Sequence, residues 1–247
     1  MSDVKICSMN CRGLGDYQKR RDVLHYLRKL ECNIFLLQDV HCQKGKELYY
    51  RNAWGNDILI SSYTNNARGV AILWKSVALK VLDKIVHDEG NYIIAKILID
   101  NYLSFVIANV YGPNEDCPEY WAEIWEMCER LADQTSPIII AGDFNLVLDQ
   151  KMDTVNYARA HNVRARNRLK IIMQENDLVD VFRKRNPFLC RYTWGRKNPL
   201  QQARLDFFLV SDTIDLLIQN TEIVPGYRTD HCMVKLSINP RPGRGGG

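Results

Sequence analysis

Residues 136–145 read Ser-Pro-Ile-Ile-Ile-Ala-Gly-Asp-Phe-Asn. The isoleucines and the alanine are apolar at odd and even positions alike, which is typical of a strand covered on both faces of its sheet. A glycine ends the apolar run, and Asp143 and Asn145 follow it closely. The segment therefore predicts a central buried strand with a carboxylate and an amide beyond its carboxyl end.

Further runs rich in β-branched and aromatic residues predict additional strands. The predicted strands span residues 4–9, 33–40, 57–62, 69–74, 92–99, 103–111, 136–141, 204–211 and 232–238. Helical periodicity predicts helices over residues 18–30, 119–133 and 164–176. Since strands occur both singly and in consecutive pairs, we expect an α/β fold of two mixed β-sheets packed face to face with flanking helices, a four-layered sandwich.

Composition is that of an ordinary globular protein. The chain has 247 residues, of which 46% are hydrophobic, and a formal net charge of +4. We expect one domain over residues 1–239 and a flexible Gly/Arg-rich tail over residues 240–247. The mild positive charge permits a polyanionic partner without requiring one.

The cysteines and the hydropathy of the chain indicate where in the cell the protein is expected. The 8 cysteines form no Cys-x-x-Cys pair, so free thiols are a better reading than a disulfide framework or a zinc site. No apolar run reaches the ~18 residues that a membrane span needs. We therefore expect a soluble, intracellular protein that does not contact a membrane.

Polar residues fall where several predicted strands end or begin. Taken singly, an Asp after a strand is more often a turn or cap residue. Taken together, loops at one end of a sandwich converge, and crowded carboxylates repel each other unless a cation or fixed donors compensate. Oxygen ligands indicate Mg²⁺ or Mn²⁺ rather than zinc, and such a site suits hydrolysis of a phosphate ester. The residues concerned are Asn10, Asp39, Tyr111, Asp143, Asn145, Asp206, Asp230 and His231.

Short motifs follow one another along nearly the whole chain. They are N-x-R-G-L at 10–14, L-L-Q-D at 36–39, N-V-Y-G-P-N at 109–114, G-D-F-N at 142–145, Y-T-W at 192–194, R-L-D-F-F-L-V-S at 204–211 and T-D-H at 229–231. In this order they resemble the DNase-I-like exonuclease–endonuclease–phosphatase superfamily. Residues 69–74, 142–153 and 226–231 are similar to the apurinic-type endonuclease domain of LINE (non-LTR) retrotransposons.

The resemblance implies a role for each matching residue. Asp143 would orient or deprotonate the attacking water, and Asn145 would bond both water and phosphate. His231, paired with Asp206, would donate to a non-bridging phosphate oxygen. The other implied roles belong to Asp39, Asp230 and Asn10 at the metal, Tyr111 and Asn114 at the scissile phosphate, and Thr193 as a brace of the site.

Two positions depart from the family pattern. Asp39 stands where the family has a metal-binding glutamate, and it is one methylene shorter. Mg²⁺ demands tight geometry, so Asp39 must bind through water or bring its backbone closer. Arg12 stands where repair enzymes tend to have an acid, and it can either touch phosphate or pair with a neighbouring acid.

Two segments are candidates for DNA contact. Residues 159–170 carry several cations and no acid, including Arg164, Arg166 and Arg168. In an arbitrary protein this would be a solvated helix face, whereas beside a phosphodiesterase site phosphate contact is the better interpretation.

The other candidate is the segment 194–203, which predicts a polar hairpin. In LINE-type endonucleases the equivalent hairpin helps to select the target, although an ordinary exposed turn is the alternative. Ala203 stands where repair enzymes have an aromatic wall of the abasic pocket, which argues against abasic specificity. The hairpin side chains that could reach a groove are Arg196, Lys197, Gln201 and Gln202.

The sequence thus favours a Mg²⁺-dependent endonuclease that nicks one strand of double-stranded DNA and leaves a 3′-hydroxyl. In a retrotransposon that end primes reverse transcription, so the expected partner is a reverse transcriptase domain of the same polyprotein. We expect a monomer acting on chromosomal DNA in the nucleus, with Mn²⁺ as an alternative ion. The rival hypotheses are an abasic-site repair endonuclease, another phosphoesterase of the superfamily, or a catalytically weakened DNA-binding module.

Overall fold

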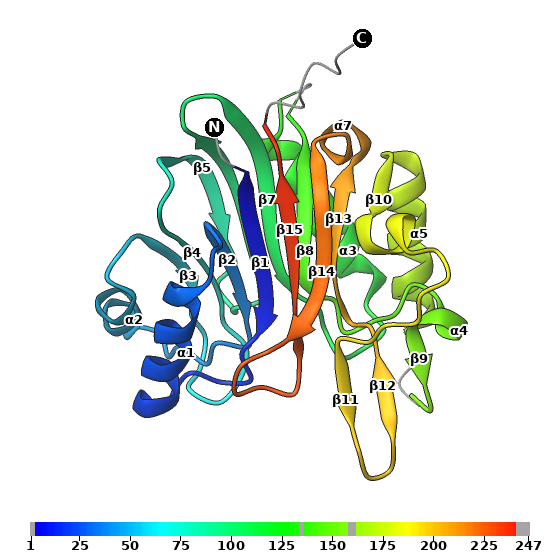
Figure 1. Cartoon of the computed structure of the whole chain (residues 1–247), viewed down its shortest axis with the longest axis horizontal. Coiled ribbons are helices and arrows are strands. Elements are labelled where there is room, and N and C mark those ends of the chain that lie inside the picture. Colours follow the sequence, from blue (N-terminus) through cyan, green and yellow to red (C-terminus); the bar gives the residue numbers. More distant parts are fainter. Residues whose placement is uncertain (1–2, 134–135, 158–161, 241–247) are drawn as a thin grey trace.

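The computed structural model describes residues 3–133, 136–157 and 162–240, and its architecture is a four-layered α/β sandwich (Figure 1). The first six-stranded sheet has the order β14-β15-β1-β2-β4-β3. Its strands are β1 (Val4–Asn10), β2 (Ile34–Gln38), β3 (Ile58–Ser61), β4 (Val70–Trp74), β14 (Ile218–Pro225) and β15 (Cys232–Ile238). The sheet is mixed, because β1 and β2 are parallel while its other neighbouring strands are antiparallel.

The second six-stranded sheet has the order β10-β13-β8-β7-β6-β5. Its strands are β5 (Leu79–Val86), β6 (Tyr92–Ile99), β7 (Leu103–Tyr111), β8 (Ile138–Asp143), β10 (Leu178–Asp180) and β13 (Asp206–Ser211). It is also mixed, with β7 and β8 as its parallel pair. The prediction of two mixed sheets is therefore confirmed.

A small third sheet holds the predicted hairpin. It joins β11 (Trp194–Arg196) and β12 (Gln201–Ala203) to the short β9 (Thr154–Val155). Antiparallel pairing of Trp194 with Ala203 fixes the base of this hairpin, which projects beyond the large sheets (Figure 1).

Helices cover the outer faces of the sandwich. The longer ones are α1 (Tyr17–Lys29), α2 (Glu47–Trp54), α3 (Pro118–Leu131) and α5 (Val163–Glu175), and the short ones are α4 (Gln150–Asp153), α6 (Val181–Arg185) and α7 (Asp212–Asp215). Helices α1 and α2 pack on the first sheet, and α3 and α5 pack on the second. The predicted helices are confirmed with ends shifted by one or two residues.

Strand β8 shows why its sequence decides the fold. Ile139 and Ala141 point into the core between the two sheets, while Ile138 and Ile140 point into the core beneath α3 and α5. All residues of β8 are buried. The apolar run is continuous because both faces of this strand are covered.

The longer strands β5 and β14 were not predicted, and neither were the short strands β9 and β10 or the helices α2, α4, α6 and α7. Strand β5 lies at a sheet edge, and β14 lies at the edge of the other sheet. Both expose one face, and β5 carries Lys80, Asp83 and Lys84, so charged residues interrupt the apolar pattern that marks a strand. Helix α2 is short and its buried residues are only Tyr50 and Trp54.

The thiol prediction is confirmed, since the cysteines are free and most are buried. Among the described residues, no helix is both long enough and apolar enough to span a membrane. Of the predicted tail, the structure describes only the first residue, Pro240, and residues 241–247 lie outside the described part of the chain.

Candidate active site

Strand direction brings the predicted site residues to one edge of the sandwich. The parallel strands β1 and β2 end there in register, with Asn10 beside Gln38. In the other sheet Asp143, at the end of β8, lies beside Tyr111 of β7 and opposite Asp206 of β13. Figure 1 shows β1 ending at this edge, next to the loop that joins β14 to β15.

Asp143 is the centre of the group. Its Oδ2 accepts a 2.8 Å hydrogen bond from Asn10 Nδ2, and its Oδ1 accepts one of 2.9 Å from the backbone N–H of Asn145. Burial and the neighbouring Asp206 raise the pKa of Asp143 to about 7, although His231, Asn10 and Asn145 act in the opposite direction. A carboxylate whose pKa lies near neutrality can take a proton from water and release it again.

Two glycines let the loops of the site approach each other. A Cβ on Gly112 would lie 2.3 Å from the carbonyl oxygen of Phe144, and one on Gly142 would lie 2.0 Å from that of Val110. The close approach allows the carbonyl oxygen of Gly112 to accept a 2.8 Å hydrogen bond from Asn145 Nδ2. Phe144 is stacked on Phe207 at 3.9 Å between ring centroids, which anchors the turn that carries Asp143 and Asn145.

His231 and Asp206 form the second half of the group. His231 Nδ1 lies 2.9 Å from Asp206 Oδ2, and His231 Nε2 lies 3.9 Å from Asp143 Oδ2. Burial by itself lowers the pKa of His231, but Asp206, Asp143 and Asp230 outweigh it and raise that pKa to about 9. The imidazole is therefore a cation at neutral pH, with Nε2 facing the site.

Thr193 and Tyr111 lie beside this group. Thr193 Oγ1 accepts hydrogen bonds of 2.9 and 3.0 Å from the backbone N–H groups of Leu205 and Asp206. Tyr111 has its pKa raised above the usual range by burial and by the charges of Asp39 and Asp143. Its hydroxyl therefore stays protonated and can donate a hydrogen bond.

Asp39 and Asp230 lie at the rim with other partners. Asp39 Oδ1 is 2.8 Å from His41 Nε2. Asp230 Oδ2 accepts hydrogen bonds of 2.9 Å from Arg12 Nη1 and 3.2 Å from Trp194 Nε1. Of the two alternatives left open for Arg12, the structure shows pairing with an acid.

The donor atoms fit a hard divalent cation. Within the described ranges, one group of His, Cys, Asp and Glu side chains has its ligand atoms within 4.8 Å of one another, namely Asp143, Asp206 and His231, and the predicted metal residues Asp39 and Asp230 are not part of it. Asp206 Oδ1 is buried and has no hydrogen-bond partner, an arrangement that a cation would relieve. The charge of Asp39 contributes to raising the pKa of Tyr111, so Asp39 lies in the vicinity of the site.

A hollow of about 350 Å³ joins these residues to the hairpin. Asn145 and His231 line it together with Arg196 and Gln201, two of the predicted DNA contacts. Its other lining residues are Tyr157, Trp194 and Leu205. Lys197 and Gln202 belong to the same hairpin and do not line the hollow, and Ala203 is fully buried at the hairpin base.

The structure describes only part of the predicted basic segment 159–170. Residues 158–161 lie outside the described residues, and α5 begins at Val163. Asn162 Nδ2 donates to the carbonyl oxygens of Asn145 at 3.2 Å and Asn114 at 3.4 Å, which sets the start of α5 against the site. Arg164 is exposed and lies 3.5 Å from Glu119, while Arg166 and Arg168 are partly exposed on the same helix.

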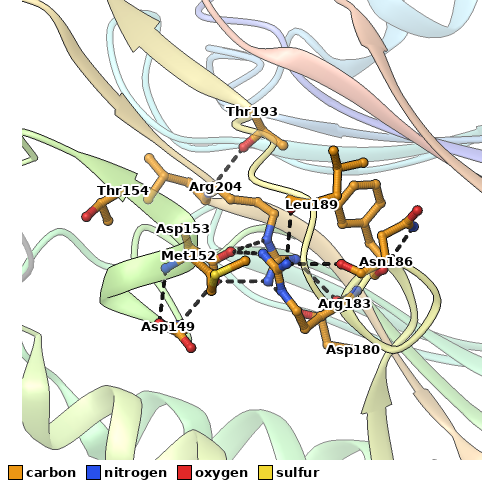
Figure 2. Close-up of polar contacts among 12 residues, drawn as sticks. Asp149, Met152, Asp153, Thr154, Asp180, Arg183, Asn186, Leu189, Thr193 and Arg204 are labelled. Atoms are coloured by element: carbon orange, nitrogen blue, oxygen red, sulfur yellow. Dashed lines mark hydrogen bonds and ion pairs between the residues drawn. The ribbon is translucent and has the colours of Figure 1, made fainter.

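Sequence reasoning missed a buried ion network beneath the hairpin (Figure 2). The Arg204 side chain is 1% exposed, and it binds Asp153 through Nε at 2.8 Å and Nη2 at 3.0 Å. It also binds Asp180 through Nη1 at 3.2 Å and Nη2 at 2.6 Å, while Arg183 holds Asp153 from the other side at 2.6 Å. The motif R-L-D at 204–206 was the available signal, since it places an arginine two residues before a site carboxylate.

A second missed feature is a pair of buried amides between the sheets. Gln38 Nε2 donates to Asn109 Oδ1 at 2.7 Å, and Asn109 Nδ2 donates to the carbonyl oxygens of Leu37 at 3.0 Å and Ala71 at 2.8 Å. The bonds join β2 to β7 just behind the site. Both amides stand in motifs that the sequence displays, next to Asp39 and before Tyr111.

Comparison with known proteins finds similarity over nearly the whole chain. The Exodeoxyribonuclease of Bacillus subtilis (strain 168) is 26% identical over 261 residues, which cover 96% of this chain and 100% of that protein. The Transposon TX1 uncharacterized 149 kDa protein of Xenopus laevis is 24% identical over 245 residues, or 97% of this chain and 18% of that protein. Among solved structures, the AP endonuclease LMAP from Leishmania major superposes with a TM-score of 0.82 at 16% identity, covering 98% of this chain and 89% of that one.

Residues 7–231 of the chain match a protein-family model. This range includes every site residue from Asn10 to His231. The chain therefore belongs to the Endonuclease/Exonuclease/phosphatase family.

Proposed function

We propose that the chain is a metal-dependent endodeoxyribonuclease that nicks one strand of double-stranded DNA. Water attacks phosphorus, and the products are a 3′-hydroxyl and a 5′-phosphate. The observation that supports this best is the buried Asp143, with a pKa of about 7, lying beside a cationic His231. Such a pair supplies a base for water and a donor for the phosphate in one space.

Two hydrogen-bond donors hold the carboxylate of Asp143 in place. Asn10 and the backbone of Asn145 fix its carboxylate, which leaves it able to take the proton of the attacking water. The Asn145 side chain lies beside the same place and bonds water and phosphate. The 3.9 Å between His231 Nε2 and Asp143 Oδ2 is longer than a direct hydrogen bond, so a phosphate oxygen can be reached from Nε2 while Asp143 reaches the water.

Asp206 positions the imidazole. Its bond to Nδ1 leaves the Nε2–H pointing at the phosphate, and its charge keeps the ring protonated as negative charge develops. Thr193 fixes the backbone of Asp206. Tyr111 and Asn114 contact the scissile phosphate from the β7 side.

Asp39, Asn10 and Asp230 would hold a divalent cation, Mg²⁺ or Mn²⁺, which would neutralise charge on the phosphoryl oxygens. Asp39 and Asp230 must then exchange His41 and Arg12 for the ion. The surrounding cations of the hairpin and α5, with Arg12, hold the DNA backbone.

The biological setting that fits is a retrotransposon. The chain matches only 18% of the Transposon TX1 protein, as one domain of a polyprotein would. The nicked 3′-hydroxyl then primes a reverse transcriptase domain of the same polyprotein, on chromosomal DNA in the nucleus. A domain over residues 1–239 that acts as a monomer is sufficient for the nick.

Nicking of supercoiled plasmid in Mg²⁺ tests the proposal. Asp143→Asn and His231→Ala should each lower the rate by at least about 100-fold with the fold intact. Asp212→Asn, an exposed acid in α7, is the matched control and should leave the rate unchanged. Full activity of either site variant contradicts the assignment of the site.

The second candidate is an abasic-site or exonucleolytic activity, favoured by the names of the Bacillus and Leishmania relatives. Parallel assays on abasic duplex, recessed 3′ ends, poly(A) and inositol phosphates separate these activities. The small Ala203, which is fully buried at the hairpin base, predicts that an abasic site gives no more than a few-fold preference over intact DNA. Binding of DNA without turnover in Mg²⁺ and Mn²⁺ would instead identify a DNA-binding module.

A further inference from the structure

Two adjoining hollows lie over the outer helices α1 and α2, away from the hairpin. One has a volume of about 270 Å³ and the other about 520 Å³. Arg20 and Tyr49 line both, so the hollows form one continuous surface, here called the α1–α2 surface. Neither the catalytic group nor the hairpin contributes a residue to it.

The charge of the α1–α2 surface is uniformly positive. Arg20, Arg21, Arg28 and Lys46 line it, and none of its described lining residues is acidic. Arg20 donates to the carbonyl oxygens of Leu14 at 2.9 Å and Gly15 at 3.0 Å, and Arg28 donates to that of Trp54. Carbonyl oxygens hold these guanidinium groups in place without neutralising their charge, so the surface attracts anions.

The nearest acids are already engaged with other groups. Asp22 on α1 binds Arg228 and lies 3.9 Å from Arg21. Glu47 on α2 accepts hydrogen bonds from Ser62 Oγ and from the backbone of Gly45. Asp22 therefore partly neutralises Arg21, whereas Arg20, Arg28 and Lys46 remain available to a partner.

Exposed aromatic rings alternate with these cations. Tyr17 is 66% exposed and Tyr49 is 59% exposed. The Arg20 guanidinium lies 5.8 Å from the ring centroid of Tyr17, and Lys46 Nζ lies 5.3 Å from that of Tyr49. Rings that expose a face beside a cation are the elements on which unpaired bases stack while their phosphates are held.

The surface begins at the candidate active site. His41 lines the smaller hollow and bonds Asp39 at 2.8 Å. Figure 1 shows α1 and α2 on one side of the site edge and the β11–β12 hairpin on the other. A strand that crosses the site from the hairpin side would therefore leave it over the α1–α2 surface.

We propose that the α1–α2 surface binds a single-stranded stretch of nucleic acid continuous with the scissile phosphate. Paired bases stack on each other and offer a protein only phosphates and groove edges, whereas the exposed rings of Tyr17 and Tyr49 need unpaired bases. The direction of the strand from the active site rests on the proposed nuclease function. The binding itself does not.

Fluorescence anisotropy with oligo(dT) of about 20 nucleotides and with a blunt duplex of similar length tests the proposal. Measurements in EDTA on the full chain keep cleavage out of the signal. Tyr49→Ala and Tyr17→Ala should each weaken oligo(dT) binding about 5-fold to 100-fold, and duplex binding less than about 2-fold. Tyr49→Phe retains the ring and should keep the affinity of the wild type.

Charge and position supply the controls. Lys46→Glu should weaken the binding of both ligands and lower its salt dependence. Phe188→Ala removes an aromatic side chain that is 90% exposed elsewhere on the molecule, and it should change neither affinity. Equal losses on oligo(dT) and duplex in the tyrosine variants would indicate plain phosphate contact and overturn the proposal.

Unchanged oligo(dT) binding in both tyrosine variants also overturns it, and leaves the surface for a protein partner. The two proposals fail separately. A wild-type chain that binds oligo(dT) through these rings but cuts no DNA removes only the nuclease function. A chain that nicks plasmid while its tyrosine variants bind normally removes only the single-strand surface.

Discussion

Replacing Arg204 by Met removes the centre of a buried ion network while keeping most of the side-chain volume. The guanidinium makes hydrogen bonds of 2.8, 3.0, 3.2 and 2.6 Å to two carboxylates, and its side chain is only 1% exposed. After the change Asp153 keeps Arg183, and Asp180 keeps only the backbone N–H of Arg183 at 3.1 Å. Asp180 is then a buried negative charge without a cationic partner.

The expected cost is about 3–5 kcal/mol of the free energy of unfolding, because removing one partner leaves a buried charge uncompensated. For a chain of this size that corresponds to a fall in Tm of roughly 6–20 °C. Urea unfolding followed by tryptophan fluorescence at pH 7.5 measures it. Lys80→Met, a change of the same kind on the exposed β5, should cost less than about 0.5 kcal/mol.

The pH dependence identifies the cause. Although burial acts to raise it, the pKa of Asp153 is lowered in the folded protein by Arg204 and Arg183. The stability that Asp153 contributes is therefore present above its unfolded pKa of about 3.9 and is lost as the pH falls through the folded value. Without Arg204 that pKa rises, so the stability difference between variant and wild type should shrink between pH 7 and pH 4.

Neutralising the acids provides a rescue. Adding Asp153→Asn and Asp180→Asn to Arg204→Met should recover much of the loss, because the two buried carboxylates are removed and Arg183 keeps the carbonyl oxygens of Asn186 and Leu189. A cost below about 1 kcal/mol for Arg204→Met, or one that does not change with pH, would refute the reasoning.

The other predictions concern the site itself. In EDTA at pH 7.5, thermal unfolding should show Asp143→Asn to be about 1–3 kcal/mol more stable than the wild type. The folded pKa of Asp143 is about 7, so the stability that its protonated form contributes below pH ~3.9 is lost as the pH rises to neutrality. Equal or lower stability of the variant would contradict this prediction. NMR titration of His231 should give a pKa of about 9, and Asp206→Asn should lower that pKa by at least about one unit. The stability that the charged His231 contributes is fully present below pH ~6.5 and is lost as the pH rises through 9. An unchanged pKa in the variant would show that Asp206 is not its cause. Asp39→Glu should lower the Kd for Mg²⁺ or Mn²⁺ about tenfold in calorimetry by restoring the reach of the ligand, and weaker binding would assign the metal to other residues. Arg196→Ala should reduce the slope of log affinity against log salt by about 0.9 and shift the map of nick positions, and an unaltered map would make the hairpin an ordinary turn.

The sequence predicted the parts of the fold in which local pattern and burial agree. Strand β8 was predictable because both of its faces are covered, and the acids beyond the strand ends were predictable because the chain attaches them directly to buried runs. The edge strands β5 and β14 were not, since exposure of one face mixes Lys, Asp and Glu into their sequence. Their strand character comes from pairing with neighbours rather than from their own residues.

The same distinction applies to the site. Asp143, Asp206 and His231 could be predicted from motifs, whereas their pKa values depend on burial that a motif does not display. The partners of Arg204 could not be predicted, because Asp180 and Asp153 lie 24 and 51 residues away in the chain. Each of those aspartates also has an ordinary local role, since Asp180 is the N-cap of α6 and Asp153 ends α4 and accepts a hydrogen bond from the backbone N–H of Asp149.

The bonds from Asn10 to Asp143 and from His231 to Asp206 have a mechanical consequence. Asn10 ends a strand of the first sheet and His231 directly precedes another, whereas both aspartates belong to the second sheet. The distances within the site therefore depend on how one sheet packs on the other, and a shift of less than an ångström between the sheets would misalign the proposed base and the proposed donor together. Residues deep between the layers, far from any phosphate, thus set the alignment on which the rate of the enzyme depends.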